Sequence, residues 1–512
     1  MNMHGEALIT PEAAGVRSAA VCSFLEAAAA EHLEIHALLM RRNSRPFFEC
    51  RWSPFTKDSF QRICSAGKTL TSIAAMFAVQ EGRFGIHTPV RELFKEASVN
   101  PQTEEMTLFH LLTMHAGHTE DSYGPMFFSG GDPFENFFRL PFNTEPGTQF
   151  FYDNGIPDIL AEAVRRSSGL RLSDYLQPRL FAPLGIKEVR VGDRGEQDDL
   201  PTFCMKTEDL MTITLFLYNK GAWNGKQLLK EDLVEQLCAW QVPTTNEAEA
   251  AACPEQPAQP GPGYGFQLWR NSFGGFALNG GAGQYGICVP ELDLCIAMHS
   301  NEVRSSRIVE LLWQHLRGNI FAQPLREDPE NFARLCAMAQ SADLCPSSGL
   351  DESLLPGGRY LIGGSLCGVT EFSIDPACGT VEFKGENGLH RLKLSDHADW
   401  APCGIPFVFP EMHNPSEHRN AVRGVRLDSN VGCDFRTGYC KMRTTAEHAL
   451  EIWFRSEAWM GSNIVCLDPL AQGGIAVSYE YGISYNLAHS SRDIGSLRES
   501  VYREVISAVP AE

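Results

Sequence analysis

The residue pair with the clearest chemical potential in this sequence is Ser65 and Lys68. Apolar residues recur at helical spacing from Leu70 to Ala78, and Gly82 is suited to end that helix. Side chains three positions apart share a helix face, so the Lys68 amine can reach the Ser65 hydroxyl. A neutral lysine could take the serine proton, and burial together with the positive end of the helix would lower its pKa toward that role. Ser65 is therefore a predicted nucleophile, with Lys68 as part of its base.

Two further segments offer groups that such a serine would need. Tyr152-Asp153-Asn154 directly precedes a predicted helix, where a tyrosine can relay a proton and an asparagine amide can orient substrate and lysine. Asn279-Gly280-Gly281-Ala282 ends a predicted strand, and its missing side chains would let a substrate lie along the edge. Alone, each segment also fits a simpler interpretation, as a half-buried tyrosine bonded to the backbone and as a glycine turn.

Taken with the segment Leu111-Leu112-Thr113-Met114-His115-Ala116-Gly117, these three elements resemble the serine β-lactamase and penicillin-binding-protein superfamily. Class C β-lactamases and related esterases are the nearest likeness. The family motifs Ser-x-x-Lys, Tyr-x-Asn and Lys/His-x-Gly occur in that chain order, and the resemblance covers roughly residues 10 to 320. It implies an α+β fold, an α/β sandwich with an antiparallel sheet and a helical lobe, with catalysis between the two.

The same resemblance assigns roles to individual residues. Ser65 would form an acyl-enzyme, and Lys68 and Tyr152 would share proton transfer. The amides of Ser65 and Ala282 would form the oxyanion hole. The substrate-binding residues would come from the second and third motifs: Asn154, Asn279, Gly280, Gly281 and Ala282.

Asn279 departs from the family pattern, because that position usually holds lysine or histidine, and Gly280 replaces a common threonine or serine. Asparagine carries no full charge, so an anchor for a substrate carboxylate is weakened and hydrolysis of penicillins is disfavoured. We therefore expect a serine hydrolase that acts through an acyl-enzyme on a small ester, amide or peptide. The altered motif leaves open a catalytically silent binding or assembly protein with the same fold.

Two other enzyme classes fit the sequence less well. Ala66-Gly67-Lys68-Thr69 ends like a nucleotide-binding P-loop, but Arg62 occupies the position of the first required glycine. The sequence also contains no G-x-S-x-G nucleophile elbow, which disfavours an α/β-hydrolase.

The elements that must position these groups follow from apolar spacing and turn residues. Helices are predicted at residues 16–31, after Ser65, and at 108–114, 156–164, 210–217 and 305–316. Strands are predicted at residues 33–40, 46–52, 264–270, 276–279, 285–289 and 292–299. Residues 243–263 are rich in proline and alanine without apolar periodicity, so we expect a mobile loop there.

A length of 512 residues favours two domains. We expect a serine hydrolase domain at residues 1–321, a linker at 322–356 with a short helix near 332–338, and a β-rich accessory domain at 357–512. The last region contains short strand-like segments and predicts a mostly antiparallel β-barrel or sandwich. These segments are residues 381–384, 392–394, 422–427, 450–454, 464–467 and 475–481.

Composition limits the kinds of partner and the cellular compartment that we expect. A net charge of -20 repels phosphate backbones and anionic membranes, so we expect no nucleic acid or membrane partner, only a small-molecule or peptide substrate. The first residues lack a secretory pattern, no apolar run could cross a bilayer, and the sixteen cysteines are scattered, so we expect reduced thiols in the cytoplasm. His32 with His36 and His115 with His118 match no metal signature, and we expect no metal or cofactor. A homo-oligomer is left open.

Overall fold

The computed structural model describes most of the chain. The described residues are 6–191, 203–244, 263–271, 274–302, 304–345, 355, 357–366, 369–385, 388–394, 399–404, 437–443, 450–456, 461–469, 475–483 and 502–510. The predicted strand at 422–427 and most of the predicted loop at 243–263 lie outside these residues.

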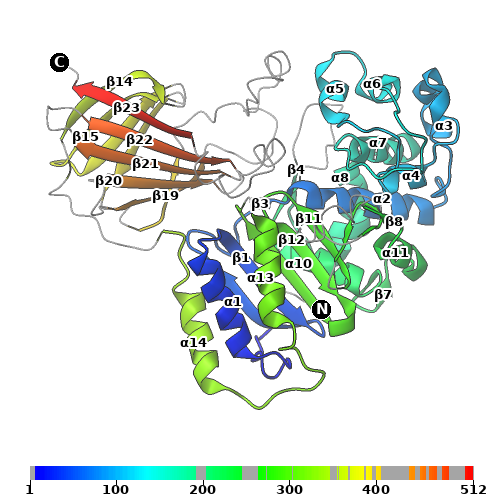
Figure 1. Cartoon of the computed structure of the whole chain (residues 1–512), viewed down its shortest axis with the longest axis horizontal. Coiled ribbons are helices and arrows are strands. Elements are labelled where there is room, and N and C mark those ends of the chain that lie inside the picture. Colours follow the sequence, from blue (N-terminus) through cyan, green and yellow to red (C-terminus); the bar gives the residue numbers. More distant parts are fainter. Residues whose placement is uncertain are drawn as a thin grey trace, which may run out of the picture.

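Within this part of the chain, the centre of the first half is an eight-stranded antiparallel sheet (Figure 1). Its order is β2 (Arg45–Arg51), β1 (Ile35–Arg42), β13 (Leu294–Ser300), β12 (Gln284–Val289), β11 (Phe276–Gly280), β10 (Trp269–Arg270), β9 (Gly263–Tyr264) and β8 (Val242–Pro243). The predicted strands therefore pair in one sheet, with one exception. The strand predicted over residues 264–270 is wrong as a single element, because Gln267 has a φ of 57° and separates β9 from β10.

Helices cover both faces of this sheet, because alternate side chains of its central strands are apolar in both directions. Ile296 and Met298 belong to the apolar core formed with α1 (Ser18–Ala30), α13 (Ser305–Leu316) and α14 (Pro329–Gln340). Cys295 and Ala297 belong to the opposite core, which includes α10 (Thr207–Tyr218). The predicted sandwich of helices and an antiparallel sheet is confirmed, and α14, within the predicted linker, packs on α1.

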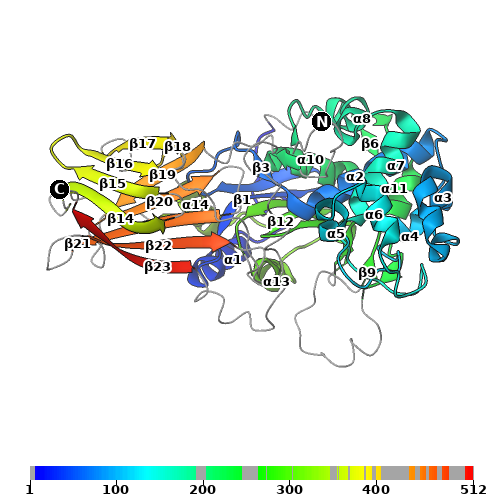
Figure 2. The ribbon, with the colours of Figure 1, turned by 90° about the horizontal axis from the view of Figure 1, so that it is seen from above.

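The rest of the first half is a helical lobe around α2 (Gly67–Gln80), which packs against α7 (Ile156–Ser168) (Figures 1 and 2). The other helices of this lobe are α3 (Val90–Leu93), α4 (Leu108–Leu112), α5 (Tyr123–Phe128), α6 (Pro133–Arg139), α8 (Leu172–Leu176), α9 (Ala182–Leu184) and α11 (Glu231–Cys238), with short turns η2 (Lys95–Val99), η3 (Pro101–Thr103) and η4 (Gln177–Phe181). Among the described residues, none of the helices combines the length and the apolar character needed to span a bilayer.

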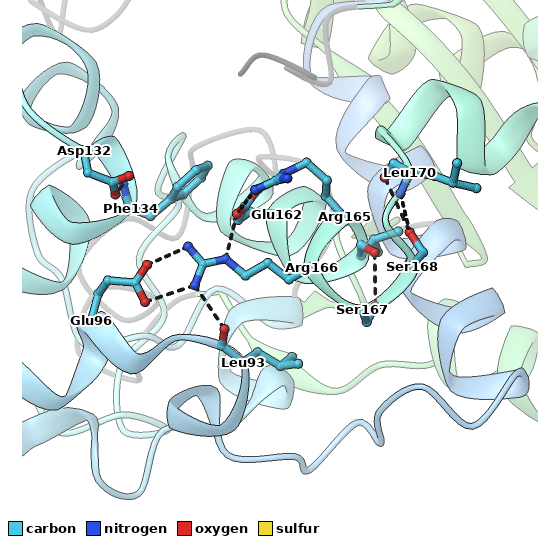
Figure 3. A network of polar contacts seen from close by, with 11 residues as sticks. Leu93, Glu96, Asp132, Phe134, Glu162, Arg165, Arg166, Ser167, Ser168 and Leu170 are labelled. Carbon is cyan, nitrogen blue, oxygen red and sulfur yellow. Dashed lines mark hydrogen bonds and ion pairs between the residues drawn. The ribbon is translucent and has the colours of Figure 1, made fainter. Parts of the chain in front are cut away.

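A polar network fixes the last turns of α7 (Figure 3). Arg166 donates from Nη2 to Glu96 Oε1 at 2.6 Å and from Nη1 to Glu96 Oε2 at 3.0 Å. It also donates from Nε to Glu162 Oε1 at 2.7 Å and from Nη1 to the carbonyl oxygen of Leu93 at 3.1 Å. The guanidinium therefore ties α7 to the segment that enters η2.

The described strands after residue 357 form a ten-stranded antiparallel sheet. Its order is β17 (Gly388–Lys393), β16 (Thr380–Gly385), β15 (Val369–Asp375), β14 (Gly358–Leu366), β23 (Tyr502–Pro510), β22 (Ile475–Ile483), β21 (Gly461–Pro469), β20 (Leu450–Ser456), β19 (Thr437–Arg443) and β18 (Ala401–Gly404). Phe383 of β16 and Phe454 of β20 lie far apart in this order, yet their rings are 6.1 Å apart. The sheet therefore curls around one apolar core, as expected for a barrel-like β-region.

Charged side chains join this curled sheet to the first half of the chain. Lys441 Nζ lies 2.8 Å from Asp343 Oδ2, and Arg455 Nε lies 3.4 Å from Glu34 Oε1. Glu34, which directly precedes β1, also contacts Nε2 of His36 within β1 at 3.0 Å. The boundaries at 321/322 and 356/357 stay a prediction.

Candidate active site

Ser65 lies in a tight turn, η1 (Cys64–Ala66), immediately before α2. The short strand β3 (Gln61–Arg62) pairs with β5 (Phe203–Met205), which itself pairs with β4 (Arg190–Val191). The amide of Ile63 donates to the carbonyl oxygen of Phe203 at 2.9 Å. Cys64 then adopts a φ of 49°, which reverses the chain just before the serine. The α-helix itself begins at Gly67, two residues after the predicted nucleophile.

The structure brings the Ser65 hydroxyl and the Lys68 amine into contact. Lys68 Nζ lies 2.9 Å from Ser65 Oγ and 2.8 Å from Asn154 Oδ1. Lys68 is buried at 7% exposure, whereas Ser65 is half-buried. A buried amine beside an accessible hydroxyl is the arrangement that a serine nucleophile and its base require.

Asp153 holds the second segment in place beneath this pair. Its carboxylate, which is fully buried, accepts from His118 Nδ1 at 2.9 Å, from Ser122 Oγ at 2.7 Å and from the Gly155 amide at 3.0 Å. Sequence reasoning missed this residue. Its signal was an aspartate three positions before a predicted helix, where carboxylates often accept from backbone amides.

Tyr152 contributes an aromatic wall beside the lysine. Its ring stacks on Trp269 with centroids 5.5 Å apart, and Trp269 in turn lies edge-on to Tyr264 at 5.0 Å. The Phe150 ring is the last member of this aromatic group, and its centroid lies 5.2 Å from that of Tyr264. Burial raises the pKa of Tyr264 far above its usual value, so that hydroxyl stays neutral. The wall gives the site an apolar side.

Gln267 explains why the segment of residues 111–117 belongs to the site. Its carbonyl oxygen accepts from Thr69 Oγ1 of α2 at 2.8 Å. Its backbone amide donates to the Leu112 carbonyl at 3.0 Å, and its Nε2 donates to the Leu111 carbonyl at 2.9 Å. This buried residue joins the nucleophile helix, the lobe and the aromatic wall.

The third segment packs directly against the nucleophile turn. A Cβ atom at Gly280 would lie 2.1 Å from the Ile63 carbonyl oxygen and 3.1 Å from the Ala66 amide nitrogen. Gly281 lies in the following turn, and Ala282 has a φ of 60°. The carbonyl oxygen of Ala282 accepts from the Glu302 amide at 3.1 Å. The glycine is therefore required for the close approach of β11 to Ser65.

Asn279 is half-buried on β11, opposite Tyr285 of β12. Among the described residues, no hydrogen bond joins its side chain to Ser65, Lys68 or Asn154. The structure thus groups Ser65, Lys68, Tyr152 and Asn154 through side chains and places the third segment beside them through its backbone. The roles of all these residues stay predictions.

The described part of the chain contains no cluster of three or more metal-ligating side chains. His36 instead contacts Gln61 Oε1 at 2.6 Å, and His118 contacts Asp153. Cys204 of β5 is disulfide-bonded, whereas the other described cysteines form no disulfide. The expectation of reduced thiols is therefore wrong at Cys204.

Comparison with known proteins gives one family and several distant relatives. The family model described as Beta-lactamase matches residues 37–317, more than half of the chain. Monacolin J acid methylbutanoyltransferase of Aspergillus terreus is 28% identical over 161 residues, which cover 27% of this chain and 39% of that protein. Lovastatin esterase of Penicillium rubens is 25% identical over 161 residues, which cover 26% of this chain and 40% of that protein. The chain thus spans about two fifths of the length of these curated relatives.

Among solved structures, a penicillin-binding protein homologue from Caulobacter crescentus is 15% identical and has a TM-score of 0.49. The similarity covers 60% of this chain and 99% of that one.

Proposed function

Because this chain belongs to the beta-lactamase family, we propose that it is a serine hydrolase that forms an acyl-enzyme on Ser65. The observation that carries the proposal is the 2.9 Å contact between Ser65 Oγ and Lys68 Nζ. In its neutral form, Lys68 takes the Ser65 proton as the oxygen attacks the substrate carbonyl carbon. Nearby backbone amides, including those of Ser65 and Ala282, stabilise the resulting oxyanion.

The proton then passes to the leaving group, and Tyr152 and Lys68 share this transfer. The bond to the leaving alcohol or amine breaks, and the acyl group stays on Ser65 Oγ. Water attacks the acyl-enzyme with the same base, which releases the acid and restores the serine hydroxyl. Asn154 holds Lys68 and positions the substrate during both steps.

A small ester, amide or peptide without an obligatory carboxylate is the proposed substrate. Asn279 supplies no positive charge, and the wall of Tyr152, Trp269 and Phe150 offers apolar contact to the acyl group. The names of the two fungal relatives, an acyltransferase and an esterase, support an ester as the first substrate class to try.

Labelling with a fluorophosphonate and turnover of p-nitrophenyl esters test the proposal. We expect a covalent adduct on Ser65, identified by peptide mass, and ester hydrolysis that disappears in Ser65→Ala and Lys68→Ala while the circular dichroism spectrum is unchanged. Retained turnover in either variant would overturn the mechanism. Absence of any label on the native protein would favour the alternative, a binding or assembly protein that keeps the fold.

A further inference from the structure

A carboxylate from the helical lobe reaches the reacting pair through one intermediate side chain. Asn154 Nδ2 donates to Asp121 Oδ2, while Asn154 Oδ1 accepts from Lys68. Asp121, Asn154, Lys68 and Ser65 therefore form a continuous chain of contacts. We propose that Asp121 is a positioning residue that fixes the Asn154 amide so that its oxygen faces Lys68. This inference rests on the proposed function.

The amide of Asn154 has an accepting end and a donating end, and rotation by 180° exchanges them. When the lone pair of neutral Lys68 faces the Ser65 hydroxyl, the amine offers only N–H donors to Asn154, so it needs the oxygen of the amide. An ionised carboxylate can only accept, so Asp121 requires the nitrogen. Together the Lys68 amine and the Asp121 carboxylate permit only one orientation of the Asn154 amide. With the amide reversed, two sets of N–H groups would face each other at Lys68.

The backbone holds Asp121 in position for this contact. Asp121 Oδ1 accepts from the Tyr123 amide at 2.9 Å, which fixes the carboxylate at the start of α5. The neighbouring residue, Ser122, donates its own amide to Asp153 Oδ1 at 2.9 Å. Because Asp153 also accepts from Gly155, the loop that bears Asp121 is tied to the loop that bears Asn154. Asp153 therefore joins the two loops, and the Asp121 carboxylate contacts Asn154.

The charge of Asp121 is sensitive to pH. Although Asp121 is an exposed residue, the surrounding chain partly desolvates its carboxylate and raises its pKa, and repulsion from Asp153 raises it further. The hydrogen bond from Asn154 and attraction to Lys68 act in the opposite direction. His118 faces Asp153 rather than Asp121, and Glu120 lies exposed on the adjacent position of the same loop. When Asp121 takes up a proton it can donate as well as accept, so the Asn154 amide is no longer held in one orientation.

Substitutions at position 121 separate positioning from bulk charge. Asp121→Asn keeps the shape but can donate or accept, so we expect kcat to fall about tenfold and the contribution of Asp121 to the acidic limb of the kcat profile to disappear, while the contribution of Lys68 stays. Asp121→Leu cannot accept at all, and we expect about a hundredfold loss of kcat with little change in KM. Glu120→Gln is the matched control, and its kcat and pH profile should equal those of the native protein.

A reciprocal exchange tests whether Asp121 acts through Asn154. Asn154→Asp alone places a second carboxylate against Asp121 and should lose kcat strongly. The double variant Asp121→Asn with Asn154→Asp restores a donor facing an acceptor, so it should recover at least about tenfold over Asn154→Asp. Additive effects of the two substitutions on kcat would overturn the proposal.

A measurement without turnover keeps this inference separate from the proposed function. In the inactive Ser65→Ala variant labelled with ¹⁵N-asparagine, the Asn154 side-chain amide signal, assigned by its loss in Asn154→Asp, should shift as Asp121 titrates. The shift should be absent when Asp121→Asn is added. A signal that does not titrate in Ser65→Ala overturns the inference, whatever the outcome of the ester assays.

Discussion

The Nζ atom of Lys68 lies 4.8 Å from the centre of the Tyr152 ring, over its face. A ring face attracts N–H groups that carry positive charge density, so this contact helps to hold the Lys68 amine in place. The same ring stacks on Trp269, which fixes its plane. Tyr152 therefore has two separable features at this site, a ring that holds the amine and a hydroxyl that can transfer a proton.

Two substitutions of Tyr152 separate these features. Tyr152→Phe keeps the ring and removes the hydroxyl, so we expect kcat for an ester with a poor leaving group to fall about a hundredfold, the usual effect of losing a general acid. Esters of p-nitrophenol need less protonation of the leaving group and should be affected less. The measurement is the ratio of kcat for alkyl and p-nitrophenyl esters of one acid.

Tyr152→Leu removes the ring as well and serves as the comparison. Both ester types should then lose kcat, because Lys68 is no longer held. An equal loss for both esters in Tyr152→Phe would contradict a leaving-group role for the hydroxyl.

The local part of the site could be predicted from sequence because it depends on helical spacing. Ser65 and Lys68 are three positions apart at a helix start, and the structure places their polar atoms in contact. The contact between Lys68 and Asn154 spans 86 positions, and only the order of motifs in a resembling family suggested it. Asp121 carried no comparable signal, because a single acidic residue in a loop is usually a solvated side chain.

Pairing between strands that are far apart in the sequence could likewise not be predicted. Alternating apolar residues indicate strands, but they do not indicate which strands pair. Tyr360 of β14 lies opposite Pro510 of β23, so the curled sheet joins residues near the start and the end of this region. At Gln267 the left-handed backbone occurs without a glycine, and the break between β9 and β10 was therefore missed.

Gly280→Ala should impair catalysis through geometry alone. The added Cβ would lie 2.1 Å from the Ile63 carbonyl oxygen, so the strand or the nucleophile turn must move. Because a shift of about 1 Å at a reacting group can cost about a hundredfold, we expect kcat/KM to fall by that order. Gly85→Ala is the control, since its Cβ would meet only Thr88 Oγ1 at 3.5 Å. Native kcat/KM in Gly280→Ala would contradict the close packing of β11 on η1.

Asn279→Lys tests whether the third segment faces the substrate. A lysine there would add a charged donor, and a charge-assisted hydrogen bond favours a substrate carboxylate by about tenfold or more. We expect KM to fall for an ester that bears a free carboxylate and to stay unchanged for its methyl ester. The pair should be compared in the native protein and the variant. An identical preference in both proteins would place residue 279 away from the bound substrate.

The Arg166 network predicts a stability that depends on pH. Hydrogen bonds from Arg166 lower the pKa of Glu96 below its usual 4.5, so the folded chain holds this carboxylate ionised. A lowered folded pKa contributes stability that is fully present above the unfolded pKa and is lost as the pH falls through the folded pKa. Arg166→Met should therefore reduce the free energy of unfolding by about 1–3 kcal/mol at pH 7 and by less under acidic conditions.

The exposed pair of Arg139 and Glu135 on α6 provides the control for this prediction. Arg139 is 61% exposed, so solvent screens the pair and Arg139→Met should change the free energy of unfolding by less than about 0.5 kcal/mol. Urea unfolding of both variants at pH 7 and near the Glu96 pKa measures the difference. Because Glu162 is nearly buried and Arg165 still contacts it, most of the Arg166→Met effect should come from Glu96. A loss in Arg166→Met that is independent of pH would show instead that the contact of the guanidinium with the Phe94 ring accounts for it.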